Sequence, residues 1–361
     1  MIPVIHIEAL PAEDGDCLWI EWPDAHGTTH RMLVDGGRGY LSRIPPGLAD
    51  RLARQLEDQR AFDLVVCTHI DVDHIGGLLA LAEDPPPGFR TADVWFNGRR
   101  HLDLLGPAQG DTLSAALARR SMPWNRAFGG AAAIVPPGDD LPVVELPSLR
   151  ITLLSPTRAQ LAMLAPSWPR VVAAAESGPG PERPSPDLLR REDADRHVEL
   201  HQLTTRRYTS DESASNASSI AFLAEDDDGD RVLLAADATA EVLAASLRRV
   251  AAGGRYRIDV CKVPHHGSRH NTSPELLSLL DCRHWLFSTS GQRHGHPHRE
   301  AMARILCRPD EVTAWFNYRG RTTEEYAGQD LAAHYGFSAV HPAPAEPGIA
   351  LRVEPGRVER A

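Results

Sequence analysis

Short runs of apolar, β-branched and aromatic residues alternate along the chain with stretches of helical periodicity, and this pattern predicts an α/β protein. The run at residues 62–67 is typical of a fully buried strand. Residues 48–60 have the spacing of an amphipathic helix, and residues 75–82 begin an apolar helix directly after the strand. Alternation of strand and helix favours helices packed in layers on sheets.

The alternation continues along the rest of the chain. Strands are predicted at residues 4–10, 17–22, 31–34, 91–98, 231–236, 257–264 and 284–288, with two more in 142–154, and helices at 110–129, 239–250, 273–280 and from 299 onward. The first two strands flank the turn-rich residues 13–16, which predicts a hairpin, and a second hairpin turn is predicted at residues 226–230. Residues 311–361 are expected to form a closing segment of strands, without identifiable chemistry.

One interruption lies at residues 157–215. Its centre, residues 177–186, is rich in Pro and Gly, and its flanks are rich in charged residues. We expect a mobile insertion or lid within a single domain that spans residues 1–361. His197 and His201 have an i, i+4 spacing that can bind metal, but no acidic partner accompanies them, so we interpret them as part of a solvated helix face.

Length and composition agree with one large domain. A chain of 361 residues that is 42% hydrophobic can bury a sizeable core. No run of about 18 apolar residues occurs, and the first residues lack the basic and apolar regions of a signal peptide. We therefore expect a cytoplasmic protein with no membrane partner.

Cysteine usage and net charge limit the kinds of metal site and binding partner that we expect. The five cysteines are scattered in apolar surroundings, which favours buried thiols over disulfides or a Cys-ligated metal. The formal charge of −11 opposes a broad nucleic-acid-binding surface. A local basic cleft is still compatible with it, and bound cations would offset nearby carboxylates.

Residues 68–77 concentrate candidate metal ligands in a strand-to-helix turn. His69, Asp71, Asp73 and His74 lie within six positions. The first two share one side of the chain by alternation and the last two can swing to the other, so the turn can hold two cations. Imidazole and carboxylate suit Zn²⁺, Mn²⁺ or Fe better than Ca²⁺. The alternative is a polar turn in which Asp73 caps the helix, but a cap needs one such side chain rather than four.

Further candidates follow two later strands. Asp237 ends one predicted strand, and His265 and His266 follow the next. Adjacent side chains of an extended chain point to opposite sides, so we expect one histidine of the pair to bind metal. Lys262 and Ser268, on either side of the pair, are candidates to meet an anionic substrate.

A histidine-rich loop reads Arg-His-Gly-His-Pro-His at residues 293–298 and precedes a predicted helix. Such a loop favours an anion through imidazole donors and free backbone N–H groups. His296 and His298 are therefore candidates for contact with a substrate phosphate or for general acid catalysis. A solvated loop is the alternative.

The sequence Thr-His-Ile-Asp-Val-Asp-His-Ile-Gly-Gly at residues 68–77 resembles the signature of the metallo-β-lactamase fold superfamily. It is similar to the variant in which Asp replaces the second His, as in the hydrolase domain of the ComEC competence protein. The resemblance extends over most of the chain through Gly15-Asp16, Leu153-Leu154-Ser155-Pro156, His265-His266-Gly267-Ser268 and the Gly-His-Pro-His loop.

The resemblance implies a four-layer αββα sandwich with the site at one edge, between the sheets. It implies that Asp237 bridges two metals and that His266 is the last metal ligand, with His265 supporting the site or facing the substrate. Asp35 would orient the ligand turn without touching metal, where the alternative is a simple Asp-Gly turn. Asn216 stands where many relatives have a metal-binding His, which leaves the first metal dependent on Asn216, on water, or one ligand short.

These features predict a metal-dependent hydrolase that uses two divalent cations, Zn²⁺ or Mn²⁺, to activate water. The predicted metal ligands are His69, Asp71, Asp73, His74, Asp237 and His266; the catalytic candidates are Asp73, Asp237, His265, His296 and His298; and the substrate-binding candidates are Lys262, Ser268 and Asn216. The likeness to domains linked to DNA degradation favours a phosphodiesterase or nuclease. The acidic charge favours a small-molecule hydrolase acting on a cyclic nucleotide, a phosphocholine ester or a lactone. The missing histidine at position 216 is the only support for a third hypothesis, a non-catalytic binding module.

Overall fold

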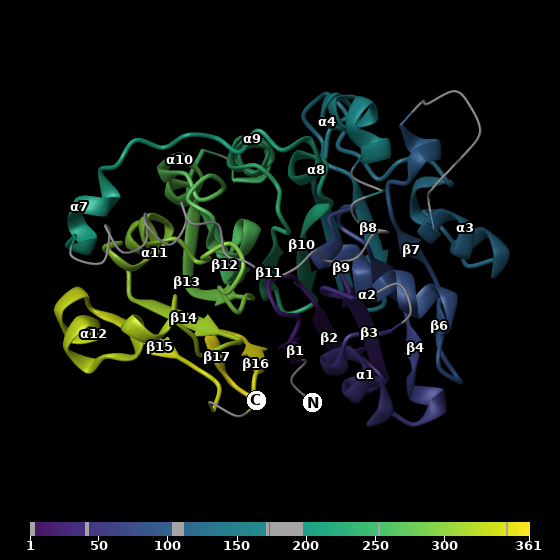
Figure 1. Ribbon diagram of the computed structural model, residues 1–361, viewed down its shortest axis with the longest axis horizontal. Coiled ribbons are helices and arrows are strands. Elements are labelled where there is room, and N and C mark those ends of the chain that lie inside the picture. The colour runs from purple at the N-terminus through teal and green to yellow at the C-terminus, as the bar shows by residue number, and fades with distance from the viewer. Residues whose placement is uncertain are drawn as a thin grey trace.

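Two large β-sheets are stacked face to face, and helices cover the outer side of each (Figure 1). The computed structural model describes residues 4–39, 43–102, 112–170, 173, 198–251, 253–343 and 346–361. This arrangement is the four-layer αββα sandwich, and the expected α/β fold is confirmed.

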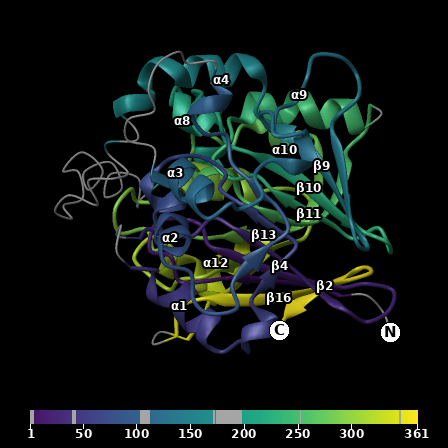
Figure 2. The same ribbon diagram turned by 90° about the vertical axis from the view of Figure 1, so that its right-hand side faces the viewer.

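The first sheet has seven strands in the order β17-β16-β1-β2-β3-β5-β7. Its strands are β1 (Ile5–Ala9), β2 (Leu18–Pro23), β3 (Thr29–Val34), β5 (Leu64–Val66), β7 (Val94–Trp95), β16 (Ile349–Glu354) and β17 (Arg357–Arg360). The predicted hairpin is confirmed, because β1 and β2 pair antiparallel. Since β1 also pairs with β16, strands from the beginning and the end of the chain, purple and yellow, lie together in the lower part of both views (Figures 1 and 2).

The second sheet has eight strands in the order β15-β14-β13-β12-β11-β10-β9-β8. Its strands are β8 (Val143–Leu146), β9 (Leu149–Ser155), β10 (Ala221–Asp226), β11 (Arg231–Leu234), β12 (Tyr256–Lys262), β13 (Leu280–Phe287), β14 (Val312–Phe316) and β15 (Phe337–Val340). From β11 to β15 all neighbours are parallel, as expected for strands joined by helices. A separate two-stranded sheet pairs β4 (Ala61–Phe62) with β6 (Arg90–Thr91).

Helices form the two outer layers. They are α1 (Pro46–Ala53), α2 (Val72–Glu83), α3 (Thr112–Arg119), α4 (Arg158–Leu164), α7 (Leu200–Thr204), α8 (Ala214–Ala217), α9 (Ala240–Val250), α10 (Pro274–Ser278), α11 (Arg299–Leu306) and α12 (Gln329–Tyr335). A core between the sheets includes Trp22 and Phe222. A second core, with Leu79, lies under α1 to α4, and a third, with Leu243, lies under α7 and α9 to α11. Each sheet is therefore buried on both faces.

Two predicted helices are shorter in the structure. Residues 48–60 were expected to be helical, but α1 ends at Ala53, and Leu56 beyond it is 67% exposed. Without a buried apolar face the chain leaves the helix and turns into β4. The helix predicted over residues 110–129 covers Thr112–Arg119, because Pro123 and the positive φ of 52° at Asn125 do not fit a continuing helix. Residues 110 and 111 lie outside the described residues.

The predicted insertion is described only at its flanks. On one side α4 packs Leu161 and Leu164 into the core of the first sheet, and on the other α7 packs Leu200 and Leu203 into that of the second. The central residues 174–197, with His197, lie outside the described residues, so the expected lid stays a prediction. His201 is exposed on α7.

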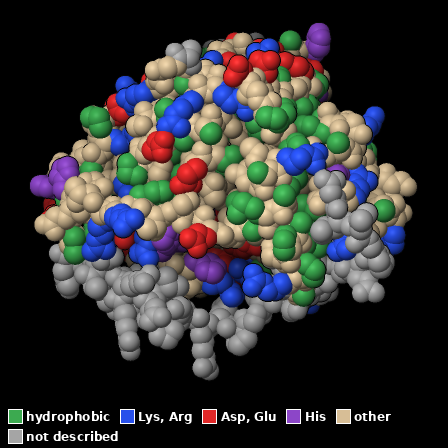
Figure 3. Space-filling view, turned by 90° about the horizontal axis from the view of Figure 1, so that it is seen from above, with side chains coloured by type: hydrophobic (Ala, Val, Ile, Leu, Met, Phe, Trp, Pro, Cys, Tyr) green, Lys and Arg blue, Asp and Glu red, His purple; other side chains and the backbone are tan. Residues whose placement is uncertain are grey.

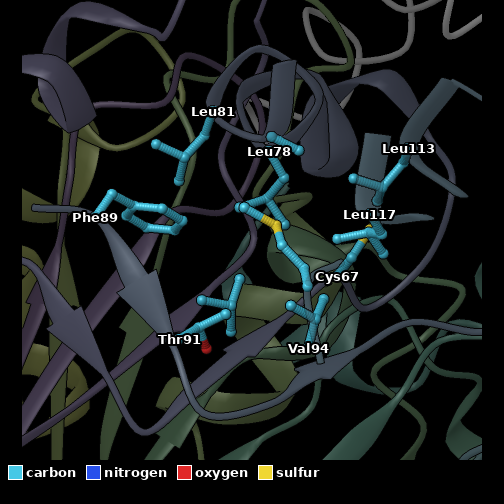
Figure 4. A pocket seen from close by; sticks show the side chains of 11 residues that line it. Cys67, Leu78, Leu81, Phe89, Thr91, Val94, Leu113 and Leu117 are labelled. Carbon is cyan, nitrogen blue, oxygen red and sulfur yellow. The ribbon is translucent and has the colours of Figure 1, made fainter. Parts of the chain in front are cut away.

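A small apolar cavity of about 20 Å³ lies behind the ligand-bearing turn, between β5, β7, α2 and α3 (Figure 4). Its lining includes Cys67, Leu78, Phe89 and Leu117. The volume suffices for about one water, but a buried water needs two or more polar partners, and this lining is almost wholly apolar. We interpret the cavity as a packing gap rather than a substrate pocket.

All five cysteines are free, and four of them are buried, as apolar surroundings in the sequence predicted. Among the helices formed by the described residues, none is both long and apolar enough to cross a bilayer.

The hairpin between β10 and β11 provides a pH-dependent prediction. Burial, with Asp226 and Asp259 nearby, raises the pKa of Asp230 to about 6. Between about pH 4 and pH 6, Asp230 is therefore protonated to a greater extent in the folded protein than in the unfolded protein. The free energy of unfolding falls as the pH rises over that range. We expect Asp230→Asn to stabilise the protein at pH 8 by about 1–2 kcal/mol, with a smaller difference at pH 5.

Urea unfolding of wild type and variant at the two pH values measures this effect. Asp227→Asn, an exposed change in the same turn, is the matched control and should move the midpoint little. A variant that is less stable than wild type at pH 8 would contradict the prediction.

Candidate metal centre

The ends of parallel strands from both sheets meet at one edge of the sandwich. Asp35 follows β3, His69 follows β5, Asp237 follows β11, and His265 and His266 follow β12. Because β3 is parallel to β5 and β11 is parallel to β12, these ends lie on one edge of their sheets. The fold thus places side chains far apart in the sequence around one point.

The motif turn leads from β5 into α2. Asp71 is the N-cap residue of α2, but its side chain makes no capping hydrogen bond and instead accepts one from Ser215 Oγ at 2.7 Å. Asp73 and His74 lie in the first turn of α2. The polar side chains of the turn therefore do more than cap a helix.

His74 is fully buried and has both ring nitrogens fixed. Its Nδ1 lies 2.8 Å from Asp35 Oδ2, and its Nε2 lies 3.4 Å from Asp237 Oδ2 and 3.1 Å from His266 Nε2. Asp35 also accepts hydrogen bonds from the backbone N–H and the hydroxyl of Thr68, at 2.8 and 2.7 Å. Asp35 thus joins the ligand turn to His74, which is more than a simple Asp-Gly turn would do.

Asp237 lies at the centre of the cluster. Its Oδ1 is 3.5 Å from His266 Nε2, and its Oδ2 is 3.9 Å from His69 Nε2. Asp73 Oδ2 is 3.9 Å from both His74 Nε2 and His266 Nε2. Asp237 therefore faces imidazole nitrogens with both oxygens: Oδ1 faces His266, and Oδ2 faces His69 and His74.

The donor atoms fit cations. His69 Nε2 and Asp237 Oδ1 are buried without a hydrogen-bond partner within the described residues. Two imidazole nitrogens bound to one Zn²⁺ at about 2.0–2.1 Å would lie about 3.3 Å apart, close to the 3.1 Å between His74 and His266. Asp73, His74, His266 and Asp237 could hold one cation. His69 and Asp71, whose Nε2 and Oδ2 are 3.6 Å apart, could share a second with Asp237.

Electrostatics at the centre favour positive charge. Burial would raise the pKa of Asp237, but His265, His266 and His74 hold it well below its usual range. Burial would lower the pKa of His74, but Asp237 and Asp35 hold it well above its usual range. The cluster stabilises cations next to Asp237, and bound metal can take the place of the protons.

Asp16 is also part of this compact cluster, with donor atoms within 4.8 Å of those of His74, Asp237 and His266. Its carboxylate forms an ion pair with Lys262 and lies 3.4 Å from His266 Nδ1, on the side of the ring away from Asp237. Lys262 is 1% exposed. The buried ion pair occupies the ammonium group of Lys262, and the contact of Lys262 with substrate stays a prediction.

Ser268 is also buried, in the turn after the histidine pair. It is 2% exposed, and its hydroxyl accepts the backbone N–H of His270 at 3.2 Å. Its carbonyl accepts a hydrogen bond from the Thr272 hydroxyl at 3.0 Å. These contacts shape the turn after the histidine pair, and a contact between Ser268 and substrate stays a prediction.

The two adjacent histidines do not point to opposite sides. His265 and His266 have positive φ angles of 45° and 54°, so the alternation of an extended chain does not apply. His265 Nε2 lies 3.4 Å from Asp237 Oδ2, while His266 Nε2 lies near the other oxygen. The expectation that the two side chains point to opposite sides is therefore wrong, and the expectation that one of them binds metal stays a prediction.

Asn216 is buried beside this pair. Its amide nitrogen donates to Asp211 Oδ2 at 2.7 Å and lies 3.3 Å from His265 Nδ1. Its Oδ1 is buried without a hydrogen-bond partner within the described residues. Asn216 thus supports His265 through Asp211, and its side-chain carbonyl oxygen is still available as a metal ligand.

The histidine-rich loop covers the histidine pair. The His296 ring is 5.0 Å from that of His265 and 4.6 Å from that of His298, between centroids. Burial, with the neighbouring Arg269 and His265, lowers the pKa of His298 to about 3, and burial and the surrounding histidines hold that of His296 well below its usual range. Both rings are neutral at neutral pH, which suits N–H donors to an anion better than general acids.

Several residues that support the centre were not predicted from the sequence. Arg38 donates two hydrogen bonds of 2.6 Å to Asp14, and its Nη2 lies 3.9 Å from Asp73 Oδ1. Gly15 lies so close to α2 that a Cβ there would be 1.6 Å from the carbonyl oxygen of Asp73, and this approach brings Asp16 to the centre. The Gly15-Asp16 pair was a usable signal, whereas Asp211 had none.

Comparison with known proteins agrees with this geometry. Residues 11–140 match the family model described as Metallo-beta-lactamase superfamily. The matched part contains the motif turn but ends before Asp237 and the histidine pair, which only the fold brings to it. No curated protein matches the chain. Residues 11–140 are thus similar to the metallo-beta-lactamase superfamily, whose members are mostly metal-dependent hydrolases, and the αββα sandwich is consistent with that fold.

Proposed function

We propose that the protein is a phosphodiesterase that uses two divalent cations, Zn²⁺ or Mn²⁺. The observation that carries the proposal is the position of Asp237, whose Oδ1 lies 3.5 Å from His266 Nε2 while its Oδ2 lies 3.4 Å from His74 Nε2 and 3.9 Å from His69 Nε2. When bound, such a cation pair stabilises negative charge on a substrate oxygen and activates water for attack.

Hydrogen bonds within the protein orient the metal-binding nitrogens of His74 and His266. The Nδ1–H of His74 is directed to Asp35, and His266 Nδ1 donates to the carbonyl oxygen of Ser288 at 2.7 Å. Each of these contacts places the ring hydrogen on Nδ1 and leaves Nε2 as a lone-pair donor. Both rings are buried, so their orientation is fixed before substrate arrives.

The loop above the centre suits an anionic group. His298 Nδ1 accepts the backbone N–H of Arg269 at 3.1 Å, which places the ring hydrogen on Nε2. His298 is also the N-cap residue of α11, and a helix N-terminus favours negative charge. Neutral imidazole donors and the helix end can hold a phosphoryl group without releasing a proton.

A small phosphodiester is better supported than long nucleic acid. On the face shown in Figure 3, the visible Lys and Arg side chains are interspersed with Asp and Glu, and several His side chains lie near both. The formal charge of −11 opposes a broad nucleic-acid surface. A nuclease of the ComEC-like branch is the second candidate, favoured by the Asp-variant motif and the Gly-His-Pro-His loop. A lactone or other small ester is the third.

A substrate panel tests the proposal. We expect metal-dependent hydrolysis of bis-p-nitrophenyl phosphate and cyclic nucleotides, and loss of about 100-fold in kcat/KM when His296→Ala and His298→Ala are combined, because two donors to the developing charge are removed. His26→Ala, an exposed change, is the matched control and should retain activity. Lactone turnover without phosphodiester turnover would overturn the proposal.

Single-stranded DNA, duplex DNA and RNA complete the panel. If a polynucleotide is the preferred substrate, KM should rise steeply with salt, because counterion release drives its binding. A small phosphodiester should show weak salt dependence. If the protein binds metals and ligands but hydrolyses none of the panel, the non-catalytic binding module becomes the better hypothesis.

A further inference from the structure

The donor group around His69 has three protein donors, His69, Asp71 and Asp237, and Zn²⁺ sites commonly have four ligands. His265 Nε2 lies 3.4 Å from Asp237 Oδ2, the oxygen that also faces His69 Nε2 at 3.9 Å and His74 Nε2 at 3.4 Å. The separation between His265 Nε2 and Asp237 Oδ2 is the one expected between two donors on one cation with bonds of about 2.0–2.2 Å. A fourth donor is thus already in place.

His265 is anchored in the way that metal-binding histidines are. Its Nδ1 lies 3.2 Å from Asp211 Oδ2 and 2.9 Å from Asn271 Oδ1. In the same way, Asp35 contacts Nδ1 of His74, and the Ser288 carbonyl contacts Nδ1 of His266. A carboxylate on the far nitrogen fixes the ring and makes Nε2 a better ligand, and such partners recur around metal sites.

Asp211 is itself held firmly. Its Oδ2 also accepts from Asn271 Nδ2 at 3.1 Å, and its Oδ1 accepts the backbone N–H of Ser213 at 2.9 Å. Its own N–H donates to the His270 carbonyl at 3.1 Å, and the Tyr208 hydroxyl donates to the same carbonyl at 2.8 Å. The segment from α7 to α8, which Figure 1 shows along the upper edge of the molecule, is thereby fixed to the turn that carries His265.

We propose that His265 is a metal ligand, completing the cation position formed by His69, Asp71 and Asp237, and that Asp211 is the positioning residue that orients it. The inference rests on the proposed function, since it presupposes two cations. It assigns both histidines of the pair to metal, one on each side of Asp237. Asn216, whose Oδ1 is buried without a partner within the described residues, is the competing ligand.

Metal content tests this without any activity measurement. Wild type, His265→Gly, His266→Gly, Asp211→Asn and Asn216→Ala are loaded with Co²⁺, dialysed, and compared by metal per chain and by visible absorption of the cobalt. Glycine is chosen for the pair because φ is positive at both positions, so the backbone is unstrained. His26→Ala is the control, and circular dichroism shows that each variant is folded.

We expect wild type to retain about two cations per chain. His265→Gly should retain about one, and added imidazole should restore the second and its cobalt spectrum, since the ring alone is missing. Asp211→Asn should lower the affinity for one of the two cations by roughly 10-fold to 100-fold, because the substitution disturbs the orientation of a ligand without removing it. His266→Gly should also lose one cation, with a cobalt spectrum different from that of His265→Gly.

The outcomes separate this inference from the proposed function. If wild type retains two cations and folded His265→Gly also binds both with unchanged affinity and spectrum, His265 is not a ligand. If Asn216→Ala loses the cation and His265→Gly keeps it, Asn216 is the ligand and the inference is overturned. If wild type never retains more than one, the two-cation proposal itself fails. Should His265→Gly not fold, unchanged binding by folded Asp211→Asn would overturn the inference.

Discussion

Asp237→Asn is expected to lower kcat/KM for a phosphodiester by at least about 1000-fold and to leave the protein folded. Both carboxylate oxygens of Asp237 face imidazole nitrogens, Oδ1 at 3.5 Å from His266 and Oδ2 at 3.4 Å from His74. Asn has a similar shape, but it has no negative charge and only one acceptor oxygen, so it cannot serve both sides. The three cores are formed by other residues, and they should keep the fold intact.

Steady-state kinetics, metal analysis and thermal unfolding measure the three parts of this expectation. Asp73→Ala should also abolish hydrolysis, because Asp73 is placed with His74 and His266 on one side of the centre. Asp227→Asn, the same change on an exposed carboxylate, should behave as wild type. If both site variants fail to fold, the cations are structural rather than catalytic.

Asp35→Asn is the second change with a large expected effect. Asp35 has a φ of 59°, a conformation that Asn accepts readily, so the variant should fold. An amide NH₂ facing His74 Nδ1 cannot accept its hydrogen, and the ring is driven to carry hydrogen on Nε2 instead. An Nε2 that carries hydrogen cannot bind metal, and we expect the cation shared by Asp73, His74 and His266 to bind at least about 100-fold more weakly.

Chelator competition with Zn²⁺ measures this change, and the affinity of the remaining cation is the internal control. Asp63→Asn serves as a matched exterior change, because Asp63 holds His30 at 2.9 Å on another part of the first sheet. It should leave metal binding unaltered. Equal metal affinity in wild type and Asp35→Asn would show that Asp35 stabilises the turn without governing His74.

Local patterns carry much of the architecture. The run at 62–67 and the apolar helix after it predict β5 and α2 because burial of both requires contiguous apolar residues. The motif turn could be identified from sequence for the same reason, since His69, Asp71, Asp73 and His74 lie within six positions and share one piece of backbone. Helix ends were predicted less well, as α1 shows, because they depend on which apolar side chains find a core.

Contacts between distant residues decided the rest. The direction of His265 depends on positive φ angles in the turn, and its anchor Asp211 is 54 residues away in the chain. The pairing of Lys262 with Asp16, which engages a residue predicted to contact substrate, joins the two sheets. The sequence by itself determined which residue types could bind cations and on which strand ends they lie, because those properties are local. Only the tertiary structure decided which of them meet, since that depends on how the two sheets stack and on long-range hydrogen bonds that no local pattern encodes.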